Sequence, residues 1–379
     1  MIANNVYKIF FFIIMALILC NKNKYLSRYL SEKKTILICP LDWGLGHAAR
    51  SAPLINQFIT EGHQVIIGAD KKPLAFLMQE FPTLKTVVIP GYEVSYGEKG
   101  SSLKLFYESV KFFSFIKEEH SFIDKIIEEN NIDVLVSDNR YGLWSKKIKS
   151  IIITHQLYVK APLGEKIAHQ KIEKLVSNFD ECWIPDVAGK VNLSGDLSHL
   201  YPIKEVYKFI GSLSRFPVAD LTTSIKEEYD VIAIVSGPEP QRTLFEKLVF
   251  KEIERNKLKA IVVRGLPGDH AELKAQNYTA KVFNHLATPL LEEYILKSKV
   301  VICRAGYSSI MDLVALRKPA LLIPTPGQTE QEYLANYHLD QGNFYSQKQV
   351  DFDLEKGLAI AGKMTPKLEF KPELDLNLI

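Results

Sequence analysis

Cysteine is scarce in this chain, and the few cysteines have no spacing that would form a site. Four occur among 379 residues, and no two of them form a C-x-x-C pair. Their scatter argues against a disulfide framework and against a zinc site built from cysteine pairs. This usage is typical of a reducing compartment, and we expect a cytoplasmic location.

A net positive charge is also lacking outside the N-terminus. The chain has a formal net charge of +3, of which the first 34 residues hold +5 and the remainder holds −2. Binding a polyanion requires a basic surface, which a slightly acidic body does not supply. The composition therefore predicts that the protein does not bind nucleic acid.

The chain lacks an apolar run long enough to cross a bilayer. The run Ile9–Cys20 has 12 residues, whereas a spanning helix needs about 20. The large residues before Cys20 do not suit a signal-peptide cleavage site. The basic residues after the run would keep the rest of the chain in the cytoplasm. Residues 1–33 are either a weak anchor at the inner face of the membrane or an extension without function, and they are left out of the predicted fold.

From Lys34 onward, short β-branched apolar runs alternate with longer amphipathic stretches. This alternation is typical of parallel strands joined by crossover helices. The predicted strands are TILICP, HQVIIGA, KTVVIP, IDVLVSD, SIIITH and ECWIP, followed by DVIAIVS, KAIVVRG, KVF, KVVICR and PALLIP. We therefore predict an α/β protein made of two Rossmann-like domains, whose parallel sheets face each other across a cleft.

The two series of strands set the predicted domain boundaries. Residues 34–210 form the first domain, residues 211–350 the second, and residues 351–379 a C-terminal helix and tail. Helices are predicted over Ala49–Gly62, where the glycine ends the helix, and over Leu103–Glu129, which is unusually aromatic.

The turn after the first predicted strand, PLDWGLGHAARS, matches a dinucleotide-binding fingerprint. Gly44, Gly46 and Ala49 fit G-x-G-x-x-A, and Asp70 follows about 20 residues later. His47 does not suit such a turn, because its ring would lie against the pyrophosphate. A histidine aimed into the cleft is suited to act as a base or to orient a hydroxyl. His47 is therefore either a polar residue of the first helical turn or a catalytic base, with an NAD or FAD site as the alternative.

Other candidates in the first domain also follow strands. Ligands of an open parallel sheet bind beyond the carboxyl ends of its strands. Asp138 and Arg140 follow one predicted strand, and His155 follows the next. These three side chains could share a cleft with His47, although each one taken singly also suits a structural role.

Three loops of the second domain carry residues suited to an anion or to sugar hydroxyls. The turn SGPEPQRT offers Gly237, whose backbone can approach a ligand, and Arg242, which can add charge to a phosphate. The stretch ICRAGYSSIMDL ends a strand and starts a helix, which places free amides at the positive end of the helix dipole. In IPTPGQTEQEYLANY, Glu330 and Gln331 can bind two hydroxyls of a sugar.

Two of these helix starts have the spacing of a capping box. Ser309 and Asp312 are three residues apart, as are Thr329 and Glu332. The second box would explain Glu332 and leave the side chains of Glu330 and Gln331 free. The first box is a structural alternative for Asp312.

The Gly-His turn, R-A-G-x-S-S at 304–309 and E-Q-x-x-x-A at 330–335 together resemble the GT-B glycosyltransferases. The closer resemblance is to the family of the N-acetylglucosaminyltransferase that completes lipid II. It covers residues 34 to about 350, and Val300–Ala335 is its most specific part. It implies a UDP-type sugar donor bound by the second domain and an acceptor facing the first domain. It also implies catalysis without a metal or other cofactor, with helix dipoles stabilising the leaving diphosphate. No D-x-D motif follows a predicted strand, which agrees.

The resemblance also suggests roles for the candidates. His47 and Asp138 are the catalytic candidates, while Gly44, Gly46, Arg140 and His155 lie on the acceptor side. Residues 304–309 would hold the diphosphate, Asp312 the ribose, and the backbone of residues 284–286 the base. The donor candidates are Gly237, Arg242, Asn284, His285, Leu286, Arg304, Ala305, Gly306, Tyr307, Ser308, Ser309, Asp312, Gln328, Glu330 and Gln331.

The predicted function is metal-independent transfer of a sugar from a nucleotide sugar to a lipid-linked or glycan acceptor of the cell envelope. A non-hydrolysing nucleotide-sugar epimerase, a dinucleotide-binding oxidoreductase and a non-catalytic binder of nucleotide sugars are the alternatives. The aromatic residues from Phe106 to Phe115 form either core or a membrane-facing patch for a lipid-linked acceptor. Peripheral contact with the membrane therefore stays open.

Overall fold

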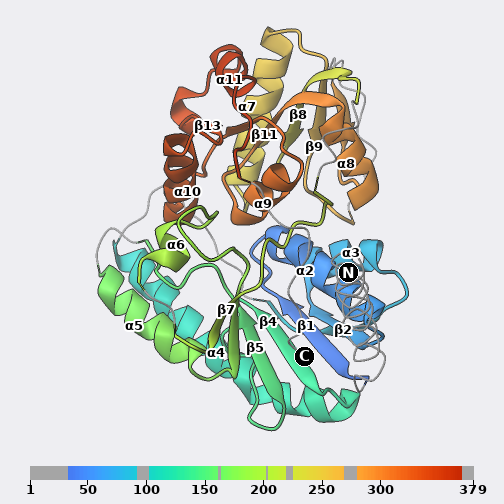
Figure 1. Cartoon of the computed structure of the whole chain (residues 1–379), viewed down its shortest axis with the longest axis vertical. Helices are drawn as coiled ribbons and strands as arrows, with labels where there is room; N and C mark the ends of the chain where they lie inside the picture. The colour runs from blue at the N-terminus through green and yellow to red at the C-terminus, as the bar shows by residue number, and fades with distance from the viewer. Residues whose placement is uncertain are drawn as a thin grey trace, which may run out of the picture.

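The computed structural model describes residues 33–91, 102–160, 164–201, 204–218, 225–268 and 280–368. It contains two all-parallel sheets with helices packed against them, one above the other in Figure 1. The predicted α/β class with two Rossmann-like sheets is confirmed. The predicted extension before Lys33 and the tail after residue 368 lie outside the described residues. Within the described residues, no helix combines the length and the apolarity that a membrane crossing requires.

The first sheet has seven strands in the order β3-β2-β1-β4-β5-β6-β7. They are β1 (Thr35–Pro40), β2 (Gln64–Ala69), β3 (Lys85–Val88), β4 (Val134–Asp138), β5 (Lys149–Ile153), β6 (Glu181–Ile184) and β7 (Tyr207–Phe209). The helices of this half are α2 (Gly46–Thr60), α3 (Lys71–Glu80), α4 (Ser102–Asn130), α5 (Glu165–Val176) and α6 (Asp196–His199).

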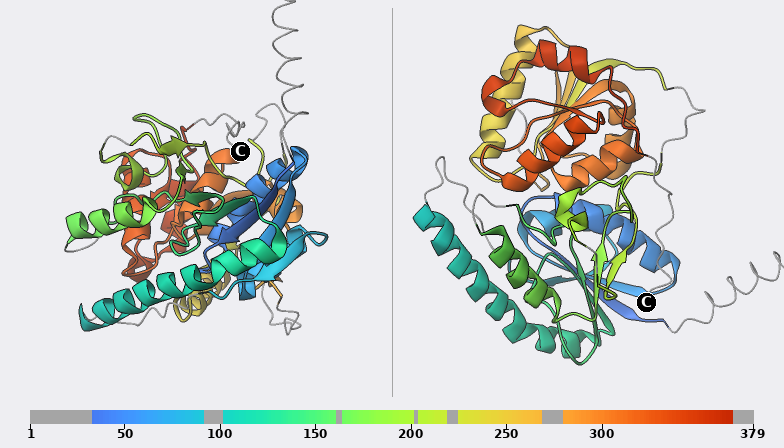
Figure 2. Two further views of the ribbon diagram at one scale, coloured as in Figure 1. Left: turned by 90° about the horizontal axis from the view of Figure 1, so that it is seen from below. Right: turned by 60° about the vertical axis from the view of Figure 1, so that its left-hand side comes forward.

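Alternate residues of β1 pack against helices on opposite faces of this sheet. Ile36 and Ile38 lie in a cluster with side chains of α2, whereas Leu37 and Cys39 lie in a cluster with side chains of α4. Both faces are therefore buried, as expected for a parallel sheet and its near-continuous apolar strands. Figure 2 shows the long helix α4 on the outer side of this half and α2 between the two sheets.

The second sheet has six strands in the order β10-β9-β8-β11-β12-β13. They are β8 (Tyr229–Ile234), β9 (Ala260–Val263), β10 (Lys281–Phe283), β11 (Ser298–Cys303), β12 (Ala320–Leu322) and β13 (Tyr345–Ser346). The helices of this half are α7 (Gln241–Arg255), α8 (Thr288–Leu296), α9 (Tyr307–Ala315), α10 (Thr329–Asp340), the 3-10 helix η1 (Gln349–Asp351) and α11 (Leu354–Ala361).

All eleven predicted strands are present, and the structure adds β7 and β13. These two have three and two residues, too few for a periodic pattern to be recognised. The chain passes from one sheet to the other between Phe209 and Tyr229, and the predicted boundary at residues 210/211, which falls in this stretch, stays a prediction. The helix predicted from Ala49 begins three residues earlier, at Gly46, so His47 lies in its first turn.

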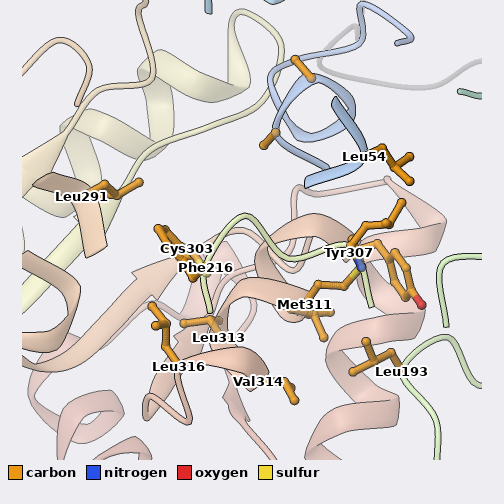
Figure 3. Packing of buried hydrophobic residues seen from close by; sticks show 14 of the residues in the cluster. Leu54, Leu193, Phe216, Leu291, Cys303, Tyr307, Met311, Leu313, Val314 and Leu316 are labelled. Carbon is orange, nitrogen blue, oxygen red and sulfur yellow. The ribbon is translucent and has the colours of Figure 1, made fainter. Parts of the chain in front are cut away.

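One hydrophobic cluster contains side chains of both halves and holds α2 against α9. Figure 3 shows Tyr307 and Met311 of α9 in this cluster with Leu54 of α2 and Leu193 of the loop after β6. All four side chains are almost completely buried. Below, the first half means residues 33–218 and the second half residues 225–368. Their packing brings the loops at the ends of the two sheets together.

Candidate active site

Each sheet has one point at which the strand order reverses, and ligands of open parallel sheets bind in the crevice at that point. In the first sheet it lies between β1 and β4, which pair as far as Pro40 and Asp138. In the second sheet it lies between β8 and β11. In the first half this point holds His47, in the first turn of α2, and Asp138, which ends β4. In the second half it holds Gly237 and Gly306.

His47 and Asp138, the two predicted catalytic residues, are in contact. The Nδ1 atom of His47 lies 3.1 Å from Oδ1 of Asp138. Arg50, one turn further along α2, donates from Nε to Oδ2 of Asp138 at 2.7 Å and from a second nitrogen to Oδ1. Burial alone would raise the pKa of Asp138, but Arg50 and His47 hold that pKa well below its ordinary value. An ionised carboxylate therefore lies behind the imidazole of His47.

His155 extends this chain of hydrogen bonds into the second half. A terminal nitrogen of Arg50 lies 3.0 Å from Nδ1 of His155, and Nε2 of His155 lies 2.8 Å from Oε1 of Glu330 on α10. The His155 ring stacks on Tyr307, with ring centroids 4.0 Å apart and planes 6° apart. Burial lowers the pKa of His155, although Glu330 opposes that effect. The chain of contacts thus runs from His47 to Glu330 across both halves.

The first turn of α9 borders open space at the end of the second sheet. Gly306 caps this helix, and a Cβ added to it would meet only Ser309 Oγ, at 4.0 Å. Gly237 has φ +111°, and a Cβ added to it would have Thr325 Oγ1 as its nearest neighbour, at 4.0 Å. That hydroxyl is buried and has no hydrogen-bond partner in the part of the chain that the structure describes. Space before a helix N-terminus with close backbone approach suits a phosphate.

Three further residues of the R-A-G-x-S-S motif join the halves or fill the core. Ala305 is fully buried. The Tyr307 hydroxyl donates to the carbonyl of Pro185 at 2.8 Å, and Ser308 Oγ donates to the carbonyl of Gly46 at 2.8 Å. The start of α9 is therefore fixed against the glycine turn that precedes His47.

Arg304 points into the protein, away from the open space that its predicted role as a diphosphate ligand requires. Its terminal nitrogens donate to the carbonyls of Ile323 at 3.1 Å and Gln241 at 3.0 Å. Its guanidinium carbon lies 4.1 Å from the centroid of the Phe245 ring. Burial lowers its pKa to about 9, and no carboxylate of the described residues forms an ion pair with it. Arg304 thus braces the loops of the site.

Two other predicted ligands are neutralised by carboxylates and are not free to bind a phosphate or an acceptor. Arg242 pairs with Glu239 at 2.5 Å and with Glu246 at 2.6 Å. Arg140 donates from Nε to Glu119 at 2.6 Å, on the side of the sheet covered by α4. Arg140 follows β4 as predicted, and Arg242 lies in the first turn of α7 after the loop that follows β8. The sequence could not give the direction of either side chain.

The predicted capping box of Ser309 and Asp312 is wrong. Gly306 is the N-cap of α9, without a side-chain hydrogen bond. Asp312 accepts from Ser214 Oγ at 2.9 Å and from Arg215 Nε at 3.1 Å. Asp312 therefore ties the segment between the two sheets to α9, and these bonds occupy the carboxylate that was predicted to hold a ribose.

The second predicted capping box is also wrong, because Gln328 is the N-cap of α10. Its Oε1 accepts from the amide of Gln331 at 2.6 Å, and its Nε2 donates to Glu330 Oε2 at 3.2 Å. Gln331 Oε1 accepts from the amide of Thr325 at 2.8 Å, and Glu332 accepts from an amide of the preceding turn. The side chains of Glu330 and Gln331, predicted to be free, are both hydrogen-bonded.

The loop predicted to contact the base contacts the first half. The carbonyl of Asn284 accepts from the amide of Leu266 at 2.8 Å. The His285 ring lies edge-on to Phe76 of α3, with centroids 5.4 Å apart, and burial lowers its pKa to about 4. Leu286 is buried. The loop is therefore held in place from both sides.

The structure argues against the dinucleotide-binding alternative, because the acidic residue that it requires caps a helix instead. Asp70 is the N-cap of α3 and accepts from the amide of Lys71 at 2.8 Å. Gly44 has φ +90°, as a tight turn requires.

Within the described residues, no three His, Cys, Asp or Glu side chains are grouped so as to hold a metal ion.

Sequence reasoning missed Arg50, which contacts both Asp138 and His155. A signal was available, because a residue three positions after His47 on a helix lies on the same face. Arginine at such a position, close to an acidic candidate, is a reason to expect an ion pair.

Comparison with known proteins gives consistent matches. Residues 231–363 match the model of the glycosyltransferase family 28 C-terminal domain. An uncharacterized glycosyltransferase of Methanosarcina acetivorans is 24% identical over 321 residues, which cover 79% of this chain and 81% of the relative. A UDP-N-acetylglucosamine--N-acetylmuramyl-(pentapeptide) pyrophosphoryl-undecaprenol N-acetylglucosamine transferase of Lawsonia intracellularis is 22% identical and covers 77% of each chain.

Solved structures share the fold. The Arabidopsis thaliana protein UGT89C1, complexed with UDP-L-rhamnose, aligns with a TM-score of 0.58 at 14% identity over 92% of this chain and 91% of that one. The calicheamicin glycosyltransferase CalG4 aligns with a TM-score of 0.55 at 10% identity over 88% and 90%. The fold and these matches define the chain as a glycosyltransferase of the GT-B type. It resembles the family of the transferase that forms lipid II, and its second half matches the model of the family 28 C-terminal domain.

Proposed function

We propose that the protein transfers a sugar from a UDP-sugar to an acceptor hydroxyl, without a metal ion, and that His47 is the general base. The observation that carries this proposal is the chain of contacts from His47 through Asp138, Arg50 and His155 to Glu330. It links an imidazole backed by a carboxylate with the first turn of α10. His155 in this chain also stacks on Tyr307 of α9, the helix whose start borders open space. Such a pairing suits group transfer between ligands bound at the two crevices.

In the proposed step, Nε2 of His47 accepts the proton of the acceptor hydroxyl. The hydroxyl oxygen forms a bond to the anomeric carbon of the donor sugar, while the bond from that carbon to the diphosphate oxygen breaks. UDP leaves with the bonding electrons. The amides of the first turn of α9 and its dipole stabilise the charge on the diphosphate. The buried charge of Arg304 adds to this stabilisation from behind the loop.

We further propose that the acceptor enters beside Trp43 and Phe112. Trp43 belongs to the turn before His47, is 40% exposed, and has its ring centroid 5.9 Å from that of Phe112 on α4. The ammonium of Lys171 lies 5.1 Å from the Phe113 ring. This aromatic edge supports an acceptor with an apolar part, such as a lipid-linked glycan delivered at a membrane surface. Phe106, the other end of the predicted aromatic patch, has a side chain outside the described residues.

Ligand-dependent thermal unfolding of the full chain tests the donor. UDP, UDP-N-acetylglucosamine, UDP-glucose and NADH are each titrated against the free protein. We expect a rise in Tm with UDP or a UDP-sugar, because a ligand at 100 times its Kd stabilises the folded state by about 2.7 kcal/mol. A rise with NADH and none with any uridine nucleotide would contradict the proposal. Formation of an epimer from a UDP-sugar alone would indicate an isomerase.

The variant Gly306→Ala tests the position of the diphosphate. Its backbone, with φ −77° and ψ 142°, suits alanine, and the added methyl meets no atom closer than 4.0 Å. We expect an unchanged Tm of the free protein and a clearly smaller rise with UDP, because the methyl fills the space before the helix. An undiminished rise would place the donor elsewhere.

A further inference from the structure

Arg50 joins the two ends of the candidate site, and its side chain is only 1% exposed. It lies on the same face of α2 as His47. Its guanidinium contacts Asp138 through two nitrogens and His155 through the third. We propose that Arg50 is a positioning residue that fixes His47 and His155 in opposite tautomers. Only the catalytic consequence, and not the tautomers, rests on the proposed function.

The tautomer of His47 follows from its partner. An ionised carboxylate can only accept hydrogen bonds, and both oxygens of Asp138 accept from Arg50. Nδ1 of His47, 3.1 Å from Oδ1 of Asp138, must therefore carry the proton. In the neutral ring with this tautomer, Nε2 carries the lone pair that a general base requires. Arg50 fixes the plane of the carboxylate and so the direction of the imidazole.

The tautomer of His155 follows from the opposite rule. A guanidinium can only donate, so Nδ1 of His155, 3.0 Å from a terminal nitrogen of Arg50, must accept. The proton lies on Nε2 and is donated to Glu330 at 2.8 Å. The Tyr307 ring, stacked on the imidazole, keeps its plane. His155 therefore presents a fixed donor to the carboxylate on α10.

The rings of His47 and His155 are surrounded by the same charged groups. These are Arg50 of α2, Asp138 at the end of β4 and Glu330 of α10. The buried guanidinium of Arg50 binds Asp138 directly and is attracted to the charge of Glu330. A lysine at position 50 would keep the charge but could not span Asp138 and His155 together, because its single ammonium lacks the planar fork. Arg50 thus positions His47 through Asp138 and Glu330 through His155.

Nitrogen-15 NMR of the histidine rings tests this assignment on the full chain, without substrate. The resonances of His47 and His155 are assigned by their loss in His47→Gln and His155→Gln. We expect a protonated Nδ1 for His47 and a protonated Nε2 for His155 at neutral pH. The reverse tautomer in either ring overturns the proposal.

The variant Arg50→Lys extends the test, with Arg140→Lys as its matched control. Arg140 is also buried and ion-paired, but its partner Glu119 lies on the α4 side of the sheet. We expect Arg50→Lys to shift the His155 nitrogens toward a mixture of tautomers, and Arg140→Lys to leave both rings unchanged. Unchanged His155 resonances in Arg50→Lys overturn the proposal.

Turnover separates this inference from the proposed function. The release of UDP from UDP-N-acetylglucosamine and from UDP-glucose is measured at saturating donor, with a polyprenyl-linked glycan extract as acceptor. We expect kcat of Arg50→Lys to fall about 10²-fold with a smaller change in KM, and kcat of Arg140→Lys to stay within a few fold. No release by the native chain from any UDP-sugar, with the expected tautomers present, contradicts the proposed function and leaves the assignment of Arg50 standing.

Discussion

Acidification is expected to weaken the contact between α10 and the first half, because His338 is buried there without charge. Its ring is fully buried, and Nε2 lies 3.0 Å from the carbonyl of Leu193. Nδ1 faces the side-chain amide of Asn343 at 3.3 Å. A second proton on the ring would meet that amide. Burial accordingly lowers the pKa of His338 to about 4.

The sign and size of the effect follow from linkage. Below pH 6.5 the unfolded chain binds a proton at His338 that the folded chain does not bind, so the free energy of unfolding falls as the pH drops from 6.5 toward 4. The gap between the two pKa values corresponds to about 3 kcal/mol in full, of which about 2 kcal/mol is lost by pH 5. His155 and His285, whose pKa values burial also lowers, act in the same direction.

Urea unfolding of the full chain at pH 7.5 and pH 5 measures this loss. We expect His338→Gln to reduce the difference between the two pH values by about 2 kcal/mol, because glutamine can still donate to Leu193 and does not titrate. Phe344→Leu is the control, since Phe344 is fully buried with its ring centroid 5.6 Å from that of His338. It should lower stability equally at both pH values. The same pH difference in His338→Gln and in the native chain would refute the reasoning.

Two further substitutions test the packing around the site by chemical denaturation. Gly195→Ala should lower the free energy of unfolding by about 3 kcal/mol, because Gly195 has φ +53° and an added Cβ would overlap the hydroxyl of Tyr333. Gly164 has φ +80° and open space around it, so Gly164→Ala should lower the free energy of unfolding clearly less. An equal loss of stability in the two variants would contradict the overlap. Arg304→Met should cost about 3 kcal/mol because it leaves buried carbonyls without a donor, and an unchanged free energy of unfolding would show that the guanidinium is not needed there.

The arrangement of strands could be predicted because each long strand is an apolar, β-branched run bounded by turn residues. The contact of His47 with Asp138 could also be anticipated, since both follow strands at one point of the sheet. The contact of His155 with Glu330 could not, because it depends on how the two halves pack. That packing rests on the cluster around Tyr307 and Met311, which no local periodicity reveals.

Side-chain direction was the other part that the sequence could not supply. Arg304 directly follows β11 and Arg242 lies in the first turn of α7, but carbonyls bind the terminal nitrogens of Arg304 and carboxylates pair with Arg242. The spacing of a capping box was misleading at both helices, because Gly306 and Gln328 begin them instead. Asp312 was drawn into contact with Arg215, a residue almost one hundred positions away in the chain.

The general-base role of His47 is the central claim, and the comparison of His47→Ala with the native chain tests it most directly. The release of UDP from UDP-N-acetylglucosamine is measured at saturating donor with a polyprenyl-linked glycan extract as acceptor, beside the rise in Tm caused by UDP. We predict a fall in kcat of about 10²- to 10⁴-fold with the UDP-dependent rise in Tm retained, since His47 lies on the acceptor side. Equal turnover by the two proteins would contradict the account.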